Sequence, residues 1–224
     1  AKYYAMCTWF DETCGQLIKV LEDRKLRDDT IIVYVTDNGW IQNPERNGYA
    51  PRSKQTPYEG GIRTPIMFSW PNGDLKNGKR KDVISSIDLF PTVLAATGAR
   101  VPEGLPGLNL MDSLKEEKPV KRKGIFGETF AHDVTDVENP EASLVFRWTI
   151  EGKWKLLLTY DGEVNRYKST HPRTEKRPQL FNLLKDPKEE KNLAEHNPEV
   201  VARLAAKIEK WWPVKERKVL TKWE

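Results

Sequence analysis

The sequence has no apolar run of about 18 residues, the length that a membrane-spanning helix needs. We therefore expect no membrane span and no membrane partner. No signal-peptide pattern opens the chain, and its first residue is Ala1 rather than methionine. A helical pattern follows at once, so we expect these 224 residues to be a piece of a longer polypeptide.

Cysteine is scarce as well, because only Cys7 and Cys14 occur. On a helix over residues 3–25 the two would lie about two turns, roughly 10 Å, apart. A disulfide needs Cα atoms within about 7 Å, so these cysteines are not expected to pair with each other. Neither has a cysteine or histidine at the spacing of a metal site. Both are predicted to be packing residues, and the redox compartment stays open.

A strong charge bias is also absent. The net charge is only +4, although basic residues gather at residues 79–81, 121–123 and 173–177. Solvated surface loops are the favoured interpretation of these clusters, and attraction of a polyanion is the alternative. Nucleic acid is not an expected partner, because the clusters are scattered and no known binding motif accompanies them.

The first part of the chain combines a helical pattern with buried-strand patterns. Apolar residues recur at spacings of three and four along residues 3–25, which indicates one apolar face of an amphipathic helix. Residues 30–36 form a continuous, β-branched run, typical of a strand buried on both faces of a parallel sheet. Further core strands are predicted at residues 65–70 and 124–130. A helix followed by a buried strand favours an α/β architecture.

The last part of the chain has an antiparallel pattern. Residues 144–150 and 154–160 flank the turn Glu151-Gly152-Lys153, which predicts a hairpin. Residues 179–183 are expected to add a strand, and a helix is expected to begin at Asn197-Pro198. We therefore predict a main α/β part over residues 1–140 and a small part of antiparallel sheet and helix over residues 141–224.

The segment Thr36-Asp37-Asn38-Gly39 is the first candidate for a functional site. Asn-Gly alone favours a hairpin turn. Here, however, the preceding strand is predicted to be buried, and no partner strand of matching pattern follows. Ligands bind beyond the carboxyl ends of such strands, and a carboxylate beside an amide oxygen suits Ca²⁺ or Mg²⁺. Asp37 and Asn38 are too few for a metal site, so further ligands must come from elsewhere.

Lys54 is the second candidate, within a long loop over residues 39–64. Loops of this length are uncommon in compact domains unless they have a function. Pro57 and Gly60-Gly61 would stiffen and turn the chain just after the lysine. A surface lysine is the plainer interpretation, and a point charge for an oxyanion is the alternative that the setting favours. Glu59 and Arg63 are four residues apart, and we expect structural roles for both.

Together these motifs resemble those of the type I sulfatases, members of the alkaline phosphatase superfamily. The resemblance rests on Tyr3-Tyr4-Ala5-Met6, Thr36-Asp37-Asn38-Gly39, Lys54 to Pro65, Ser86 to Thr92, Gln179 to Leu183 and Asn192-Leu193-Ala194. It implies an α/β sandwich with a mostly parallel sheet, helices on both faces and a small antiparallel C-terminal subdomain. It also implies that Asp37 and Asn38 are two of four side-chain ligands of a calcium ion and that Lys54 contacts the sulfate group.

One departure from the family is serious. The Cys-x-Pro-Ser-Arg motif, whose cysteine becomes the formylglycine nucleophile, is missing, and neither Cys7 nor Cys14 stands in it. The paired aspartates that complete the metal shell are missing too. We therefore expect the C-terminal half of a sulfatase, with the nucleophile and the other calcium ligands on a missing N-terminal segment. The chain alone would then be an incomplete site.

The substrate is less well defined by the sequence. A sulfated carbohydrate is the expected substrate, given the basic clusters and the aromatic-rich last part. His132, which follows a predicted strand, and Arg147 are candidates for contacting it, although a structural role is the favoured interpretation of His132. A phosphodiesterase or phosphonate hydrolase of the same superfamily and a non-catalytic module that binds anionic glycans are the alternatives. The resemblance alone favours a periplasmic or secreted location.

Overall fold

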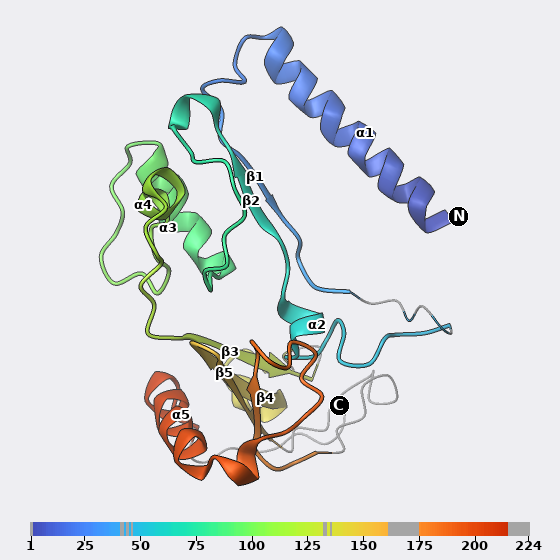
Figure 1. The fold of residues 1–224 in the computed structure, drawn as a ribbon, viewed down its shortest axis with the longest axis vertical. Helices are drawn as coiled ribbons and strands as arrows, with labels where there is room; N and C mark the ends of the chain where they lie inside the picture. Colours follow the sequence, from blue (N-terminus) through green and yellow to red (C-terminus); the bar gives the residue numbers. More distant parts are fainter. Residues whose placement is uncertain are drawn as a thin grey trace. The chain divides into compact units, whose positions relative to one another are not determined.

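The computed structural model describes residues 2–40, 43, 45, 47–131, 134, 136–160 and 175–214 (Figure 1). The chain divides into two compact units. The first combines residues 1–35 with residues 65–121, and the second combines residues 36–64 with residues 122–224. The predicted division at residue 140 stays a prediction.

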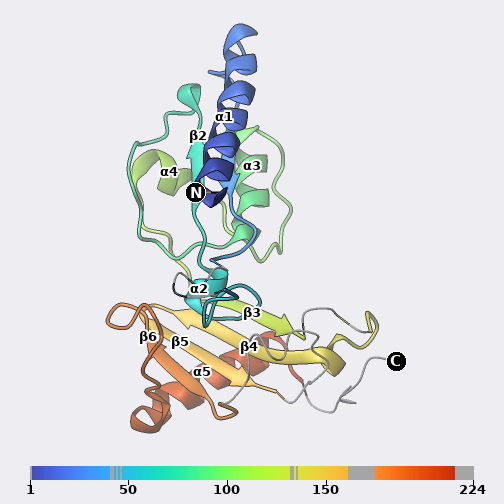
Figure 2. The same cartoon turned by 90° about the vertical axis from the view of Figure 1, so that its right-hand side faces the viewer.

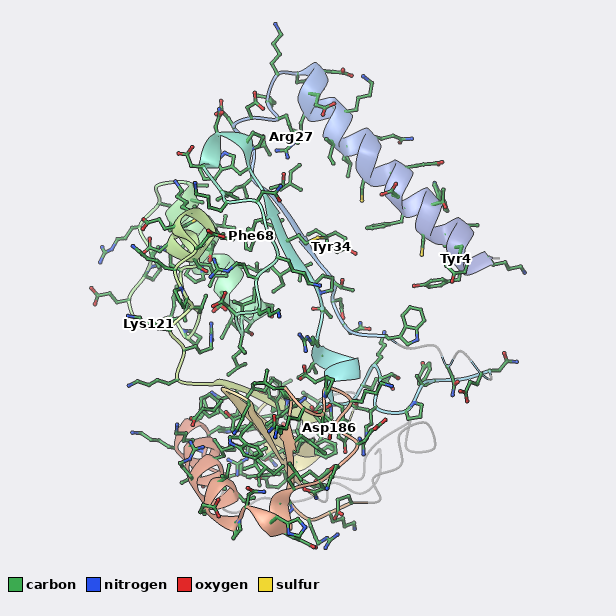
Figure 3. The ribbon with its side chains drawn as sticks, viewed as in Figure 1. Tyr4, Arg27, Tyr34, Phe68, Lys121 and Asp186 are labelled. Atoms are coloured by element: carbon green, nitrogen blue, oxygen red, sulfur yellow. The ribbon has the colours of Figure 1, made fainter. Side chains whose placement is uncertain are left out.

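The first unit begins with the long helix α1 (Lys2–Asp23), in agreement with the apolar spacing. In the part of the chain that the structure describes, no residue of α1 is buried. The ring of Phe10 lies 6.2 Å from that of Tyr34, which is labelled on β1 in Figure 3. Both cysteines of α1 are free, and Cys7 is exposed rather than packed. Among the described residues, no helix is apolar over enough of its length to cross a membrane.

Strands β1 (Ile32–Val35) and β2 (Ile66–Ser69) form a two-stranded antiparallel sheet, from the pair Ile32 and Ser69 to the pair Val35 and Ile66. The continuous apolar run of β1 indicated a strand in a parallel sheet, but its described partner runs in the opposite direction. Val35 and Met67 are exposed, so the pair is not buried on both faces.

Two short helices complete the first unit, α3 (Leu89–Ala96) and α4 (Met111–Glu116), with 3-10 turns at Pro71–Gly73 and Ser86–Asp88. The fully buried Asp88, at the start of α3, binds the loop that connects α3 to α4. Its carboxylate accepts hydrogen bonds from the backbone N–H groups of Ser85 at 2.8 Å and Leu108 at 2.7 Å. A buried carboxylate is tolerated where backbone donors satisfy it, and here it fixes the start of α3.

The second unit is built on an antiparallel sheet in the order β3-β4-β5-β6. Its members are β3 (Ile125–Phe130), β4 (Leu144–Glu151), β5 (Trp154–Thr159) and β6 (Gln179–Asn182), with 3-10 turns at Pro140–Ser143 and Ala194–His196. The hairpin and the last strand were predicted and are confirmed. The predicted core strand at residues 124–130 is confirmed in place, but β3 pairs with β4 in the antiparallel sheet.

Helix α5 (Pro198–Trp211) lies along one face of this sheet (Figure 2). It begins with Pro198 in its first turn, as predicted. Leu204 and Ile208 of α5 meet Leu156 and Leu180 of the sheet, and all four are fully buried. Strand residues alternate between the two faces, so Lys155, next to Leu156, points to the face away from α5. The short helix α2 (Glu59–Ile62) lies on that side.

Candidate active site

The segment after β1 is held by the loop that follows it. The backbone N–H of Gly39 donates to the carbonyl of Gly61 at 2.8 Å, and the N–H of Lys54 donates to the carbonyl of Trp40 at 2.9 Å. Asp37 and Asn38 immediately precede these two bonded positions. The structure thus brings the two sequence motifs together, within the second unit, although about 15 residues separate them in the chain.

Three glycines make this close approach feasible. A Cβ atom on Gly39 would lie 2.1 Å from the carbonyl oxygen of Gly60. On Gly61 it would lie 2.4 Å from that of Thr56 and 2.5 Å from that of Ser53. No side chain fits at such distances, so the glycines are required by space and not by backbone conformation. Gly60-Gly61 was expected to turn the loop, and it also seats the segment that carries Asp37 and Asn38.

Lys54 lies half-buried in a tight turn. The hydroxyl of Thr56 donates to the carbonyl of Ser53 at 2.7 Å, and the next residue after the lysine, Gln55, has a φ of +71°. Residues other than glycine adopt this left-handed conformation rarely, so the turn is specified by its surroundings. The backbone on both sides of Lys54 is therefore fixed, which is the property needed to present an ammonium group at a defined point.

Asp37 and Asn38 offer the oxygens that a hard cation prefers. Asp37 is exposed, and the amide Nδ2 of Asn38 donates to its Oδ1 at 2.5 Å. In the described residues, no cluster of three or more His, Cys, Asp or Glu side chains could hold a metal. The pair therefore fits calcium as part of a larger ligand set, with the roles of both residues still predictions.

Of the two candidates for substrate contact, the structure describes only Arg147. His132 lies outside the described residues. Arg147 is only 3% exposed, and its guanidinium donates to the hydroxyl of Tyr160 at 2.7 Å and pairs with Glu209 at 2.9 Å. It also donates to the backbone carbonyl of Trp212. These contacts tie β4 to α5 and its end, and substrate contact by Arg147 stays a prediction.

Sequence reasoning missed the residues that attach the Lys54 loop to the antiparallel sheet. The guanidinium of Arg52 donates to the backbone carbonyl of Glu189 and lies 4.8 Å from the ring centre of Tyr58. The Tyr58 hydroxyl in turn donates to Oε1 of Gln179 on β6 at 2.8 Å. Burial raises the pKa of Tyr58, so its phenol stays a hydrogen-bond donor. A signal was available in Lys155, a lone charge inside an otherwise apolar strand.

Comparison with known proteins shows which family the chain resembles. A family model described as Sulfatase matches residues 1–99. Arylsulfatase K of Xenopus laevis is 29% identical over 211 residues, which cover 93% of this chain and 36% of that protein. The chain is similar to sulfatases. An N-acetylgalactosamine-6-O-sulfatase of Bacteroides thetaiotaomicron is 27% identical to this chain, over 89% of the chain and 39% of its own length.

Solved structures agree with this assignment. A sulfatase of Bacteroides thetaiotaomicron, solved in work on its metabolism of multiple glycosaminoglycans, superposes with a TM-score of 0.70 at 26% identity. The match covers 90% of this chain and 42% of that one, and it confirms the predicted fold class. Members of the family generally use Ca²⁺ and formylglycine. The chain spans little more than a third of the length of the curated relatives that it matches.

Proposed function

We propose that this chain is part of an enzyme that hydrolyses organic sulfate esters, with a sulfated carbohydrate as its substrate. The observation that carries the proposal is the pair of backbone bonds from Gly39 to Gly61 and from Lys54 to Trp40. These bonds join the segment that carries Asp37 and Asn38 to the loop that carries Lys54, which supports a shared role for the three residues. The substrate class is supported by the relative that acts on N-acetylgalactosamine 6-O-sulfate and by the glycosaminoglycan context of the solved neighbour.

Each residue has a definite part in this proposal. Asp37 and Asn38 would hold calcium together with ligands from residues outside these 224. When bound, the calcium and the formylglycine of the whole protein would supply charge neutralisation and the nucleophile. The Lys54 ammonium would donate to a sulfuryl oxygen, and its fixed turn keeps this charge in place while the ester bond breaks. Preorganised charge of this kind stabilises the transition state more than the ground state.

The test is sulfate release by the whole protein from p-nitrophenyl sulfate and from a 6-O-sulfated N-acetylgalactosamine. We expect Asp37→Ala to abolish release and to lower the calcium content, whereas Asp28→Ala, an exposed carboxylate of the first unit, should change neither. Lys54→Ala should lower kcat by about 100-fold to 1,000-fold with the calcium retained. Unchanged turnover in Asp37→Ala would contradict the site assignment.

The same assay separates the alternatives. Faster hydrolysis of a p-nitrophenyl phosphonate monoester than of the sulfate ester would favour a phosphonate hydrolase. Binding of the sulfated sugar without any sulfate release would favour a module that only binds anionic glycans. In the second case Asp37→Ala should leave the affinity for the sugar unchanged.

A further inference from the structure

A buried ion cluster links the antiparallel sheet to the loop that carries Lys54. Lys155 of β5 is 0% exposed, and its Nζ lies 3.1 Å from Oε1 of Glu59 and 2.9 Å from Oε1 of Glu189. The first contact is a hydrogen bond, and the second is an ion pair. Glu189 is 1% exposed, so the cluster is shielded from water on the sheet side. A buried lysine is tolerated only where carboxylates pair with it.

Glu189 also binds the backbone of the loop. Its Oε2 accepts a hydrogen bond from the backbone N–H of Glu59 at 2.6 Å. This N–H belongs to the first residue of α2, where the helix has no acceptor of its own to offer. The Glu59 side chain meets Lys155 at the same time. One residue of the loop is therefore held through both its backbone and its side chain.

The turn that presents Glu189 is itself fixed. Glu189 has a φ of +57°, a conformation that few non-glycine residues adopt. The carboxylate of Asp186, labelled in Figure 3, accepts hydrogen bonds from the backbone N–H groups of Glu190 at 3.0 Å and Lys191 at 2.9 Å. This turn also offers the backbone carbonyl of Glu189 to Arg52. It thus contacts the loop on both sides of Lys54, at Arg52 and at Glu59.

From these contacts we propose that Lys155, Glu59 and Glu189 are positioning residues for Lys54. They hold the loop at its far end, two residues before the glycine that binds Gly39, so they also set the place of the segment with Asp37 and Asn38. The small C-terminal sheet then contributes to catalysis through Lys155, which positions Lys54 without contacting the substrate itself. This inference rests on the proposed function for the role of Lys54, but the clamp itself can be tested without any activity.

Hydrogen exchange of the whole protein tests the clamp. Lys155→Met removes the cation and leaves two carboxylates facing each other, which repel. We expect the amides of residues 53–63, including that of Lys54, to exchange about ten-fold faster or more, with β4 unchanged. Lys153→Met is the matched control, because Lys153 is exposed two positions away in the same hairpin. Equal exchange of residues 53–63 in both variants would overturn the proposal, whether or not the protein hydrolyses sulfate esters.

A double-mutant cycle on p-nitrophenyl sulfate tests the positioning role. Loss of register at the reacting centre costs about 100-fold, so we expect Lys155→Met to lower kcat by about that factor with little change in KM. If Lys155 acts through Lys54, the double variant with Lys54→Met should be no slower than Lys54→Met alone. Losses that multiply would show that Lys155 only supports the fold.

A milder variant keeps the test decisive if Lys155→Met unfolds the protein. Glu59→Gln keeps the size of the side chain and an acceptor for Lys155 while it removes one charge. It should loosen residues 53–63 and lower kcat by a smaller factor, again without adding to the loss from Lys54→Met. Global unfolding of both variants would contradict the proposal, since the cluster would then hold the whole unit and not the loop. A wild-type protein that releases no sulfate would instead contradict the proposed function.

Discussion

Helices α1 and α5 differ in what lies against their apolar faces. In α5, Leu204 and Ile208 are fully buried on the antiparallel sheet. In α1, large apolar side chains such as Trp9 and Leu17 stay exposed, and no described residue of the helix is buried. The hydrophobic pattern thus predicts a helix and its apolar face, but it says nothing about the partner. The partner of α5 lies within its own unit, whereas α1 has no comparable cover in the described residues.

The largest loss of stability is expected from a substitution that disrupts the packing of α5 on the sheet. Leu204→Ala should lower the free energy of unfolding of the chain by roughly 2–5 kcal/mol, because the lost methyl groups leave a cavity beside Leu156 and Leu180. Leu17→Ala in α1 is the matched substitution at a position that is 66% exposed. It should cost less than about 0.5 kcal/mol. Chemical denaturation of both variants measures the difference, and equal losses would show that α1 is buried against something after all.

The sequence likewise predicts features set by nearby residues better than contacts between distant segments. The helices and most strands follow from periodicity, because the side chains that share a face are close in sequence. The direction of β2 against β1 does not follow, because residues 36–65 separate the two strands and a connection of that length allows either direction. The pairing of β3 does not follow for a related reason, since its partner β4 begins about 14 residues after β3 ends.

The candidate site shows the same limit at the level of side chains. Asp37, Asn38 and Lys54 stand out locally, by residue type and by the glycines and proline near them. The cluster of Lys155, Glu59 and Glu189 does not, because its members are distant in sequence and meet only through the register of β5 and β6. Glu59 and Arg63, for which structural roles were expected, lie 3.6 Å apart as an ion pair. The stronger contact of Glu59, with the buried Lys155, could be recognised only in the folded structure.

A smaller effect is expected from the charge of Glu151, which helps to hold α5 against the hairpin. Glu151, at the hairpin turn, accepts hydrogen bonds from Arg203 and Lys207 of α5. Its partial burial would raise the pKa of this carboxyl, but the hydrogen bonds from Lys207 and Arg203 and their charges outweigh that effect and lower the pKa. The contribution to stability is therefore fully present above the unfolded pKa of about 4.3 and is lost as the pH falls through the lower folded value.

Glu151→Gln is expected to reveal this dependence. The stability difference between wild type and variant should be largest at neutral pH and should shrink as the pH falls below about 4. Urea denaturation at a series of pH values measures it. A difference that stays constant down to about pH 3 would mean that the hydrogen bonds, and not the charge of Glu151, hold α5 to the hairpin.

The smallest effect concerns the exposed ion pair of α1, in which Lys19 lies 2.9 Å from Asp23 within the helix. Asp23→Asn should cost only about 0.3–0.5 kcal/mol, because both groups are well solvated and spaced four residues apart. About 1 M salt should remove most of that difference by screening. Helix content and urea denaturation at low and high salt measure it. A loss above about 1 kcal/mol would mean that Asp23 contacts more than Lys19, and α1 would then resemble α5 in having a partner beyond its own helix.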